Sequence, residues 1–209
     1  MNSIRDQIQQ AIELKKEEKF EVALKILNDL YITNPTSFDV KKALIEVLFE
    51  YGAYLNDEWN EEYDKAVDCF NKIIEMEPDN YKAWYNLGIA HFHLKKTEEA
   101  LKAYQRALEI KPNYEYVLYN IGLLYETQKG DLKKALSYYE KACKLNEKFT
   151  YAFQALNDVR KKLDSLELIA SNENQLDSNS ENVCANCGNI NRAGAKFCDE
   201  CGEPTNFEE

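Results

Sequence analysis

Four cysteines near one end of the sequence have the spacing of a metal site. Cys184 and Cys187 form one C-x-x-C pair, and Cys198 and Cys201 form a second pair after ten intervening residues. A C-x-x-C spacing lets one tight turn present two thiolates, and Zn²⁺ takes four thiolates in a tetrahedron. A glycine follows each pair and tolerates the positive φ that such a turn needs. The cysteines therefore predict one Zn²⁺ per chain.

A site with four protein thiolates has no open position for water, so the predicted metal is structural. Two alternatives stay open: a pair of redox-active C-x-x-C sites, and iron in a rubredoxin-like site. Residues 183–206 resemble the short zinc-ribbon modules found at the ends of many prokaryotic proteins. So small a module buries little apolar surface, and we expect the metal to supply much of its folding free energy.

The other side chains show no catalytic motif. G-x-S-x-G, the P-loop, H-E-x-x-H and the dinucleotide fingerprint are all absent from the sequence, which predicts that the chain is not an enzyme. Cys69 and Cys143 stand among apolar residues and are expected to be buried as small hydrophobic side chains. Residues 170–182 are rich in Asn, Ser and acidic side chains, which predicts a flexible linker in front of the ribbon.

A 34-residue period runs through the chain before that linker. The clearest copy, residues 81–114, carries Trp84, Leu87, Gly88, Ala100, Tyr104, Ala107 and Pro112. These positions resemble the tetratricopeptide-repeat pattern of W-x2-L-G, then Ala, an aromatic residue and Pro, although His91 stands where the pattern prefers Tyr. Further copies carry Ala23, Leu27, Leu30 and Pro35, then Ala66, Phe70 and Pro78, and finally Leu118, Ile121, Gly122, Tyr125, Ala135, Tyr139 and Ala142.

The resemblance implies an all-α fold in which helical hairpins stack into a superhelix with a concave side. We expect about four hairpins in residues 1–169, the first of them divergent, followed by a capping helix over residues 149–169. The first helix of the second hairpin is expected to be long, at about 36–55. Gly88 and Gly122 lie inside helices, where they are costly, so we expect the backbone of a second helix to press against them.

The same resemblance implies a groove lined by the first helix of each hairpin. Its expected residues are Lys82, Tyr85, Asn86, Ile89, His93, Tyr116, Tyr119, Asn120 and Leu123. Tyr85 and Tyr119 are expected to lie side by side and to face solvent, where a Tyr ring offers apolar area with a polar tip. The two asparagines are expected to bond to a peptide backbone. The alternative is that Tyr-Asn here is only a common choice of the family.

One subclass of the family grips terminal carboxylates with basic side chains on successive repeats. This sequence has Lys82 but no Arg or Lys at Asn86, Tyr116 or Asn120, so the clamp is not complete. The resemblance therefore does not imply binding of heat-shock chaperone tails.

The net charge of the chain further limits the classes of partner that it is expected to bind. The formal net charge is −11, and residues 166–209 carry nine acidic against two basic side chains. Such a surface repels phosphate backbones and anionic lipid, which disfavours nucleic acid and membranes. No signal peptide or membrane span is apparent, so a cytoplasmic location is expected.

Together these features predict a noncatalytic interaction scaffold. The groove would bind a peptide or helix of a protein partner, and the ribbon would be a second contact module; the oligomeric state stays open. The alternative is a transcription or translation accessory factor whose ribbon contacts nucleic acid or polymerase, which the acidity of the ribbon disfavours.

Overall fold

The computed structural model describes residues 3–57, 59–180, 184, 186–189, 197–198 and 200–203. Helices account for nearly all of the described chain up to Ser180, and no strand occurs among the described residues. In chain order they are α1 (Ile4–Lys16), α2 (Phe20–Thr33), α3 (Phe38–Leu55), α4 (Tyr63–Met76), α5 (Tyr81–His93), α6 (Thr97–Ile110), α7 (Glu115–Thr127), α8 (Leu132–Leu145) and α9 (Thr150–Ser180). The predicted all-α class is confirmed.

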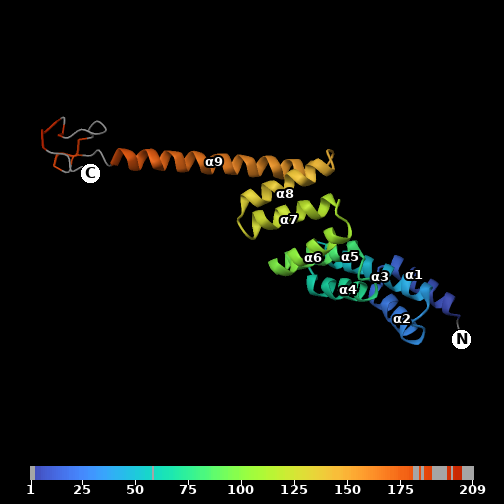
Figure 1. Ribbon diagram of the computed structural model, residues 1–209. Helices are drawn as coiled ribbons and strands as arrows, with labels where there is room; N and C mark the ends of the chain where they lie inside the picture. Colours follow the sequence, from blue (N-terminus) through green and yellow to red (C-terminus); the bar gives the residue numbers. More distant parts are fainter. Residues whose placement is uncertain are drawn as a thin grey trace. The chain divides into compact units, whose positions relative to one another are not determined.

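The helices pair into four hairpins, α1–α2, α3–α4, α5–α6 and α7–α8 (Figure 1). Each hairpin also contacts the next one, and the first helices α1, α3, α5 and α7 contact one another in that order. This is the stacking that a tetratricopeptide-like array requires, because one hairpin cannot bury its own apolar face. The long first helix expected at about 36–55 is confirmed by α3.

The turn inside each hairpin uses the same backbone device. One residue in the left-handed region stands two positions before the second helix, with φ of 57° at Glu18, 52° at Glu61, 59° at Lys95 and 66° at Gly130. Side-chain caps begin several helices: Ser3 and Asp6 form a capping box at α1, and Asn80 and Asp131 cap α5 and α8. These local signals mark where the helices that carry them begin.

The glycines of the first helices touch aromatic rings of the second helices. A Cβ at Gly122 would lie 2.6 Å from the Tyr139 ring, one at Gly52 would lie 2.8 Å from the Phe70 ring, and one at Gly88 would collide with Tyr104. The expectation that a helix backbone presses on these glycines is therefore wrong. A planar ring fills the space instead, and all three rings are fully buried.

The last helix departs from the expected boundaries. We predicted a helix ending at residue 169 and a flexible linker over 170–182, but α9 continues to Ser180. Residues 150–180 contain neither Gly nor Pro, so nothing in the backbone interrupts the helical hydrogen bonds once they have started. The predicted linker residues 181 and 182 lie outside the described residues.

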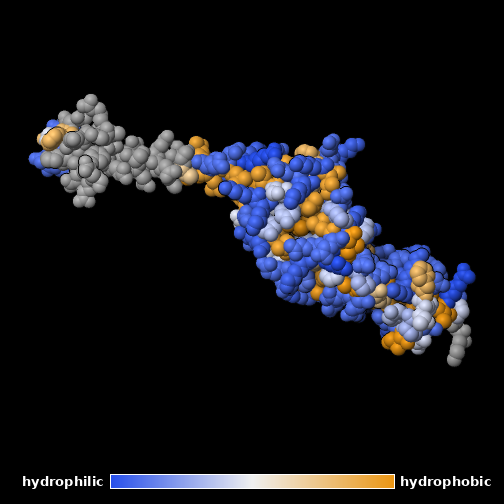
Figure 2. Space-filling view, viewed as in Figure 1, coloured by the Kyte–Doolittle hydropathy of each residue, from blue (hydrophilic) through white to orange (hydrophobic). Residues whose placement is uncertain are grey.

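Two compact units divide the chain, residues Met1–Leu156 and Asn157–Glu209. On the face that Figure 2 shows, the first unit is mostly hydrophilic, with hydrophobic residues gathered between the helices and at its N-terminal end. None of the described helices combines the length and the apolar character that a bilayer crossing needs.

Replacing Gly88 with Ala tests whether ring packing or helix propensity has the larger effect on stability at this position. Ala alone would stabilise a helix interior by about 1 kcal/mol relative to Gly. The added methyl group would instead collide with the Tyr104 ring, and overpacking of this kind costs about 1–3 kcal/mol. We therefore expect Gly88→Ala to lower the free energy of unfolding, measured by urea denaturation.

A double variant supplies the control. Tyr104→Leu removes the ring, so adding Gly88→Ala on that background should cost less than in the natural chain, or should stabilise it. Equal costs in both backgrounds would contradict the packing account.

Candidate metal centre and peptide-binding surface

The four cysteines meet at one point. Their Sγ atoms all lie within 4.8 Å of one another. The Sγ atoms of Cys184 and Cys201 are 3.6 Å apart, as are those of Cys187 and Cys198. A tetrahedral Zn²⁺ with bonds of about 2.3 Å separates its sulfur ligands by about 3.8 Å. The arrangement therefore fits a single tetrahedral ion with one ligand from each cysteine.

The two C-x-x-C pairs are built alike. In each, the glycine N–H donates to the carbonyl of the first cysteine, at 2.8 Å from Gly188 to Cys184 and at 2.9 Å from Gly202 to Cys198. The glycines have φ of 76° and 75°, as expected for this turn. The first cysteine of each pair then donates its own N–H to a carbonyl beyond the glycine, that of Asn189 or Glu203. Backbone geometry thus aims all four side chains at the centre.

Proton affinity differs among the thiols. A backbone hydrogen bond from Cys201, and after it one from Glu200 N to Cys198 Sγ at 3.4 Å, lower the pKa of Cys198 to about 6. Backbone hydrogen bonds from Cys187 and Asn186 lower the pKa of Cys184. The backbone N–H of Asn189 lowers the pKa of Cys187, but desolvation and the neighbouring sulfurs outweigh it and raise that pKa to about 12. Four crowded thiolates repel one another, and a divalent cation at their centre removes that repulsion.

Only part of the predicted ribbon is described. The segment 190–196 between the two pairs, and residues 183 and 204–206 at the ends, lie outside the described residues. What the structure describes is the two turns and the convergence of the four sulfurs.

The predicted groove residues lie on α5 and α7, the first helices of the third and fourth hairpins. Lys82 and Tyr116 are exposed, and the other predicted residues are half-buried. Within this set, the structure brings one pair into direct contact across the two helices: Asn120 Nδ2 donates to the Tyr85 hydroxyl oxygen at 3.1 Å. The same amide also donates to the Tyr116 carbonyl at 3.0 Å. Both donors of Asn120 are thus used within the chain.

Tyr85 and Tyr119 are half-buried and do not both lie open to solvent. The Tyr85 ring lies 5.2 Å from Tyr114 and 6.3 Å from Tyr104, centroid to centroid, and burial raises its pKa. The Tyr119 ring lies 5.6 Å from Tyr139 and 5.3 Å from Phe149. Each ring leans on the hairpin or helix that follows, so both tyrosines contribute to the core as well as to the surface.

Three other predicted residues, His93, Asn86 and Ile89, also contact residues of the array. The His93 imidazole lies flat on the Tyr63 ring, with centroids 4.6 Å apart and planes 4° apart. Asn86 Nδ2 donates to the Lys82 carbonyl at 2.8 Å, and the Asn86 carbonyl accepts from Asn56 Nδ2 at 3.0 Å. Ile89 packs against the apolar cluster around Tyr104. Tyr116, 45% exposed, is the most open aromatic residue of the predicted set.

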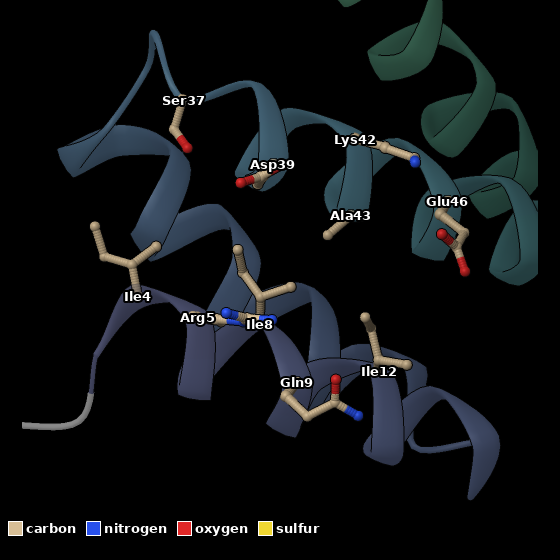
Figure 3. Close-up of a pocket in the computed structure, with 10 residues that line it drawn as sticks. All are labelled: Ile4, Arg5, Ile8, Gln9, Ile12, Ser37, Asp39, Lys42, Ala43 and Glu46. Carbon is tan, nitrogen blue, oxygen red and sulfur yellow. The ribbon is translucent and has the colours of Figure 1, made fainter.

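The sequence analysis missed an open cleft at the other end of the array. The cleft has a volume of about 580 Å³ and lies between α1 and α3, the first helices of the first two hairpins (Figure 3). Its floor is apolar, with Ile4, Ile8, Ile12 and Ala43. The spacing of the three isoleucines, i, i+4 and i+8, places them on one face of α1 and was the available signal.

Charged side chains of both signs border this cleft. Arg5 and Lys42 lie among its lining residues together with Asp39 and Glu46. Beside it, Lys15 joins α1 to α3 through ion pairs to Glu46 at 2.6 Å and to Glu50 at 2.8 Å. The cleft can therefore hold apolar side chains on its floor while charged groups meet either end of a ligand.

Comparison with known families identifies the repeats. Tetratricopeptide-repeat models match residues 60–80, 81–114 and 116–149. The subunit 3 of the anaphase-promoting complex of Schizosaccharomyces pombe is 43% identical over 93 residues, which is 44% of this chain and 14% of that protein. This chain spans less than a fifth of the length of the curated relatives that it matches. The highest share of a relative's length is 18%.

Two solved structures extend the comparison. A crystal structure of MamA protein is 20% identical with a TM-score of 0.62, over 90% of this chain and 97% of that one, which shows a shared fold. The first TPR of Spaghetti (RPAP3), bound to the HSP90 peptide SRMEEVD, is 25% identical with a TM-score of 0.52, over 57% of this chain and 93% of that one. The described helices thus form an all-α array that carries tetratricopeptide repeats over residues 60–149.

Proposed function

We propose that this chain is a noncatalytic scaffold that binds a peptide or a helix of a protein partner along its first helices. The observation that carries the proposal is the open cleft between α1 and α3, with its apolar floor and its charged border. A volume of about 580 Å³ falls in the range of ordinary ligand-binding clefts. Apolar side chains of an extended or helical segment would supply affinity there, and charged side chains would set its direction.

The first helices of the third and fourth hairpins, α5 and α7, offer a second contact region. Tyr116 presents an exposed ring, Lys82 presents a charge, and the Oδ1 atom of Asn120 is placed to accept from a peptide N–H. The RPAP3 relative, which is bound to a peptide in its solved structure, supports this use of a similar array. A segment that follows the first helices from α1 to α7 would engage both regions.

We also propose that the four cysteines hold one structural Zn²⁺. The convergence of all four sulfurs within 4.8 Å and the matching turns support this choice. The ion would fold the small module and leave no position for a substrate, so the module would act as a contact surface. Two linked weak contacts raise avidity through effective concentration when one partner reaches both. A reducing cytoplasm would keep these thiolates available.

The metal proposal predicts close to one equivalent of zinc per purified chain, measured by elemental analysis. Cys198→Ala removes one of four ligands and should reduce zinc to well below one equivalent. The control is Cys143→Ala, because Cys143 lies on α8 and not in the cluster. Stoichiometric zinc in the Cys198→Ala chain, or iron in place of zinc in the natural chain, would overturn the assignment.

The cleft proposal predicts that a charge introduced among its apolar lining residues weakens partner capture. Ile4 is 41% exposed, so Ile4→Asp should leave the helical circular dichroism and the melting transition nearly unchanged. Loss of an interface anchor costs about 1–2 kcal/mol or more, and we expect about 5- to 30-fold weaker recovery of the partner. The partner is first identified by mass spectrometry after affinity capture with the natural chain.

Ile32→Asp is the matched control. Ile32 is 76% exposed on α2, and the same substitution there should leave capture unchanged. Equal capture by the natural chain and by Ile4→Asp would mean that the cleft is not the binding surface.

A further inference from the structure

A second, smaller hollow lies at the opposite end of α3 from the α1–α3 cleft. It has a volume of about 280 Å³ and is formed by the turn before α2, the first turn of α2 and the last turns of α3. Neither the tetratricopeptide pattern nor the proposed peptide-binding surface includes it. It lies below the size range of pockets for drug-sized molecules, which suits one long side chain.

Aromatic rings form its wall. The Phe20 ring stacks on Tyr51 with centroids 5.2 Å apart and planes 22° apart, and it lies 5.4 Å from the Tyr54 ring. Phe20 is buried, whereas Tyr54 is 41% exposed. The buried ring thus holds the two tyrosines in place, and Tyr54 stays accessible from solvent.

Carboxylates dominate the charge around this wall. Glu18 and Glu21 line the hollow, and neither takes part in an ion pair within the described residues. The one ammonium in the lining, Lys19, is already paired with Glu17 at 2.7 Å. On the neighbouring helix α4, Lys65 is paired with Glu62, and the more distant charge of Glu21 also raises the pKa of Lys65.

The Tyr51 hydroxyl fixes one of these carboxylates. It donates to Glu21 Oε1 at 3.1 Å. Burial and this carboxylate raise the pKa of Tyr51 to about 12, so the phenol stays protonated and keeps donating at neutral pH. The hydrogen bond holds the Glu21 carboxylate, with its negative charge, against the aromatic wall.

We propose that this hollow binds a basic side chain, arginine or lysine, from a partner protein. Ring faces and carboxylates both attract a cation, through the ring quadrupole and through direct charge. An anionic group would be repelled by Glu18 and Glu21, and a neutral apolar group would bury them without compensation. The hollow would thus help to select a partner that carries a basic side chain. It lies apart from the α1–α3 cleft and does not depend on it.

The test is a titration of the ¹⁵N-labelled full chain, followed by NMR, with a five-residue peptide that carries one arginine between glycine and serine. Lysine and citrulline versions of the peptide are run in parallel. We expect shift changes centred on Phe20, Glu21, Tyr51 and Tyr54, with the neutral citrulline peptide giving none. The cationic peptide that binds more tightly identifies the preferred side chain.

Glu21→Gln keeps the size of the side chain and its acceptor for Tyr51 but removes the charge. It should weaken binding by at least about 3-fold, the scale of one cation contact at a partly exposed site. Tyr54→Ala should do the same, and the matched control Glu75→Gln, on the exposed face of α4, should leave binding unchanged. Equal weakening by Glu75→Gln, equal binding of citrulline, or shifts spread over the whole acidic surface would each overturn the proposal.

Discussion

The contact between a glycine of the first helix and an aromatic ring of the second helix determines how closely the second, third and fourth hairpins pack. Phe70, Tyr104 and Tyr139 fill this role in three successive hairpins, against Gly52, Gly88 and Gly122. The ring occupies the space that a side chain on the first helix would take, so the two helices approach closely without a cavity. The loss of helix propensity at glycine is offset by the burial of a whole ring.

Because the interiors of the hairpins are closely packed, the residues that can contact a ligand lie on the first helices and in the turns. Where the rings of successive repeats lean on one another, as Tyr85 on Tyr114 and Tyr119 on Phe149, the surface is largely filled. Where the repeat pattern is weakest, between α1 and α3, the surface is hollowed. Divergence from the repeat therefore coincides with the open cleft, because side chains that do not follow the packing pattern leave space between neighbouring helices.

The cysteine module follows a different physical rule. Its two turns carry matching hydrogen bonds and matching glycine conformations, and they bring the four sulfurs together. In the array, stability comes from surfaces buried between hairpins, whereas here we propose that it comes from the metal. Thiolates that repel one another without a cation would make the fold of this module depend on the proposed ion.

The sequence by itself determined the all-α class, the hairpin count and the long helix α3. It also showed which four cysteines come together, because each of these features depends on local spacing. A 34-residue period and a C-x-x-C pair are visible without neighbours. Exposure is not local: whether Tyr85 faces a ligand or Tyr114 depends on where the next hairpin stacks, and only the tertiary structure decided it. The extension of α9 to Ser180 agrees with the absence of Gly and Pro from residues 150–180, a sequence signal that the predicted linker did not take into account. The structure alone decided that α1 and α3 leave a cleft, because a cleft depends on how neighbouring helices pack.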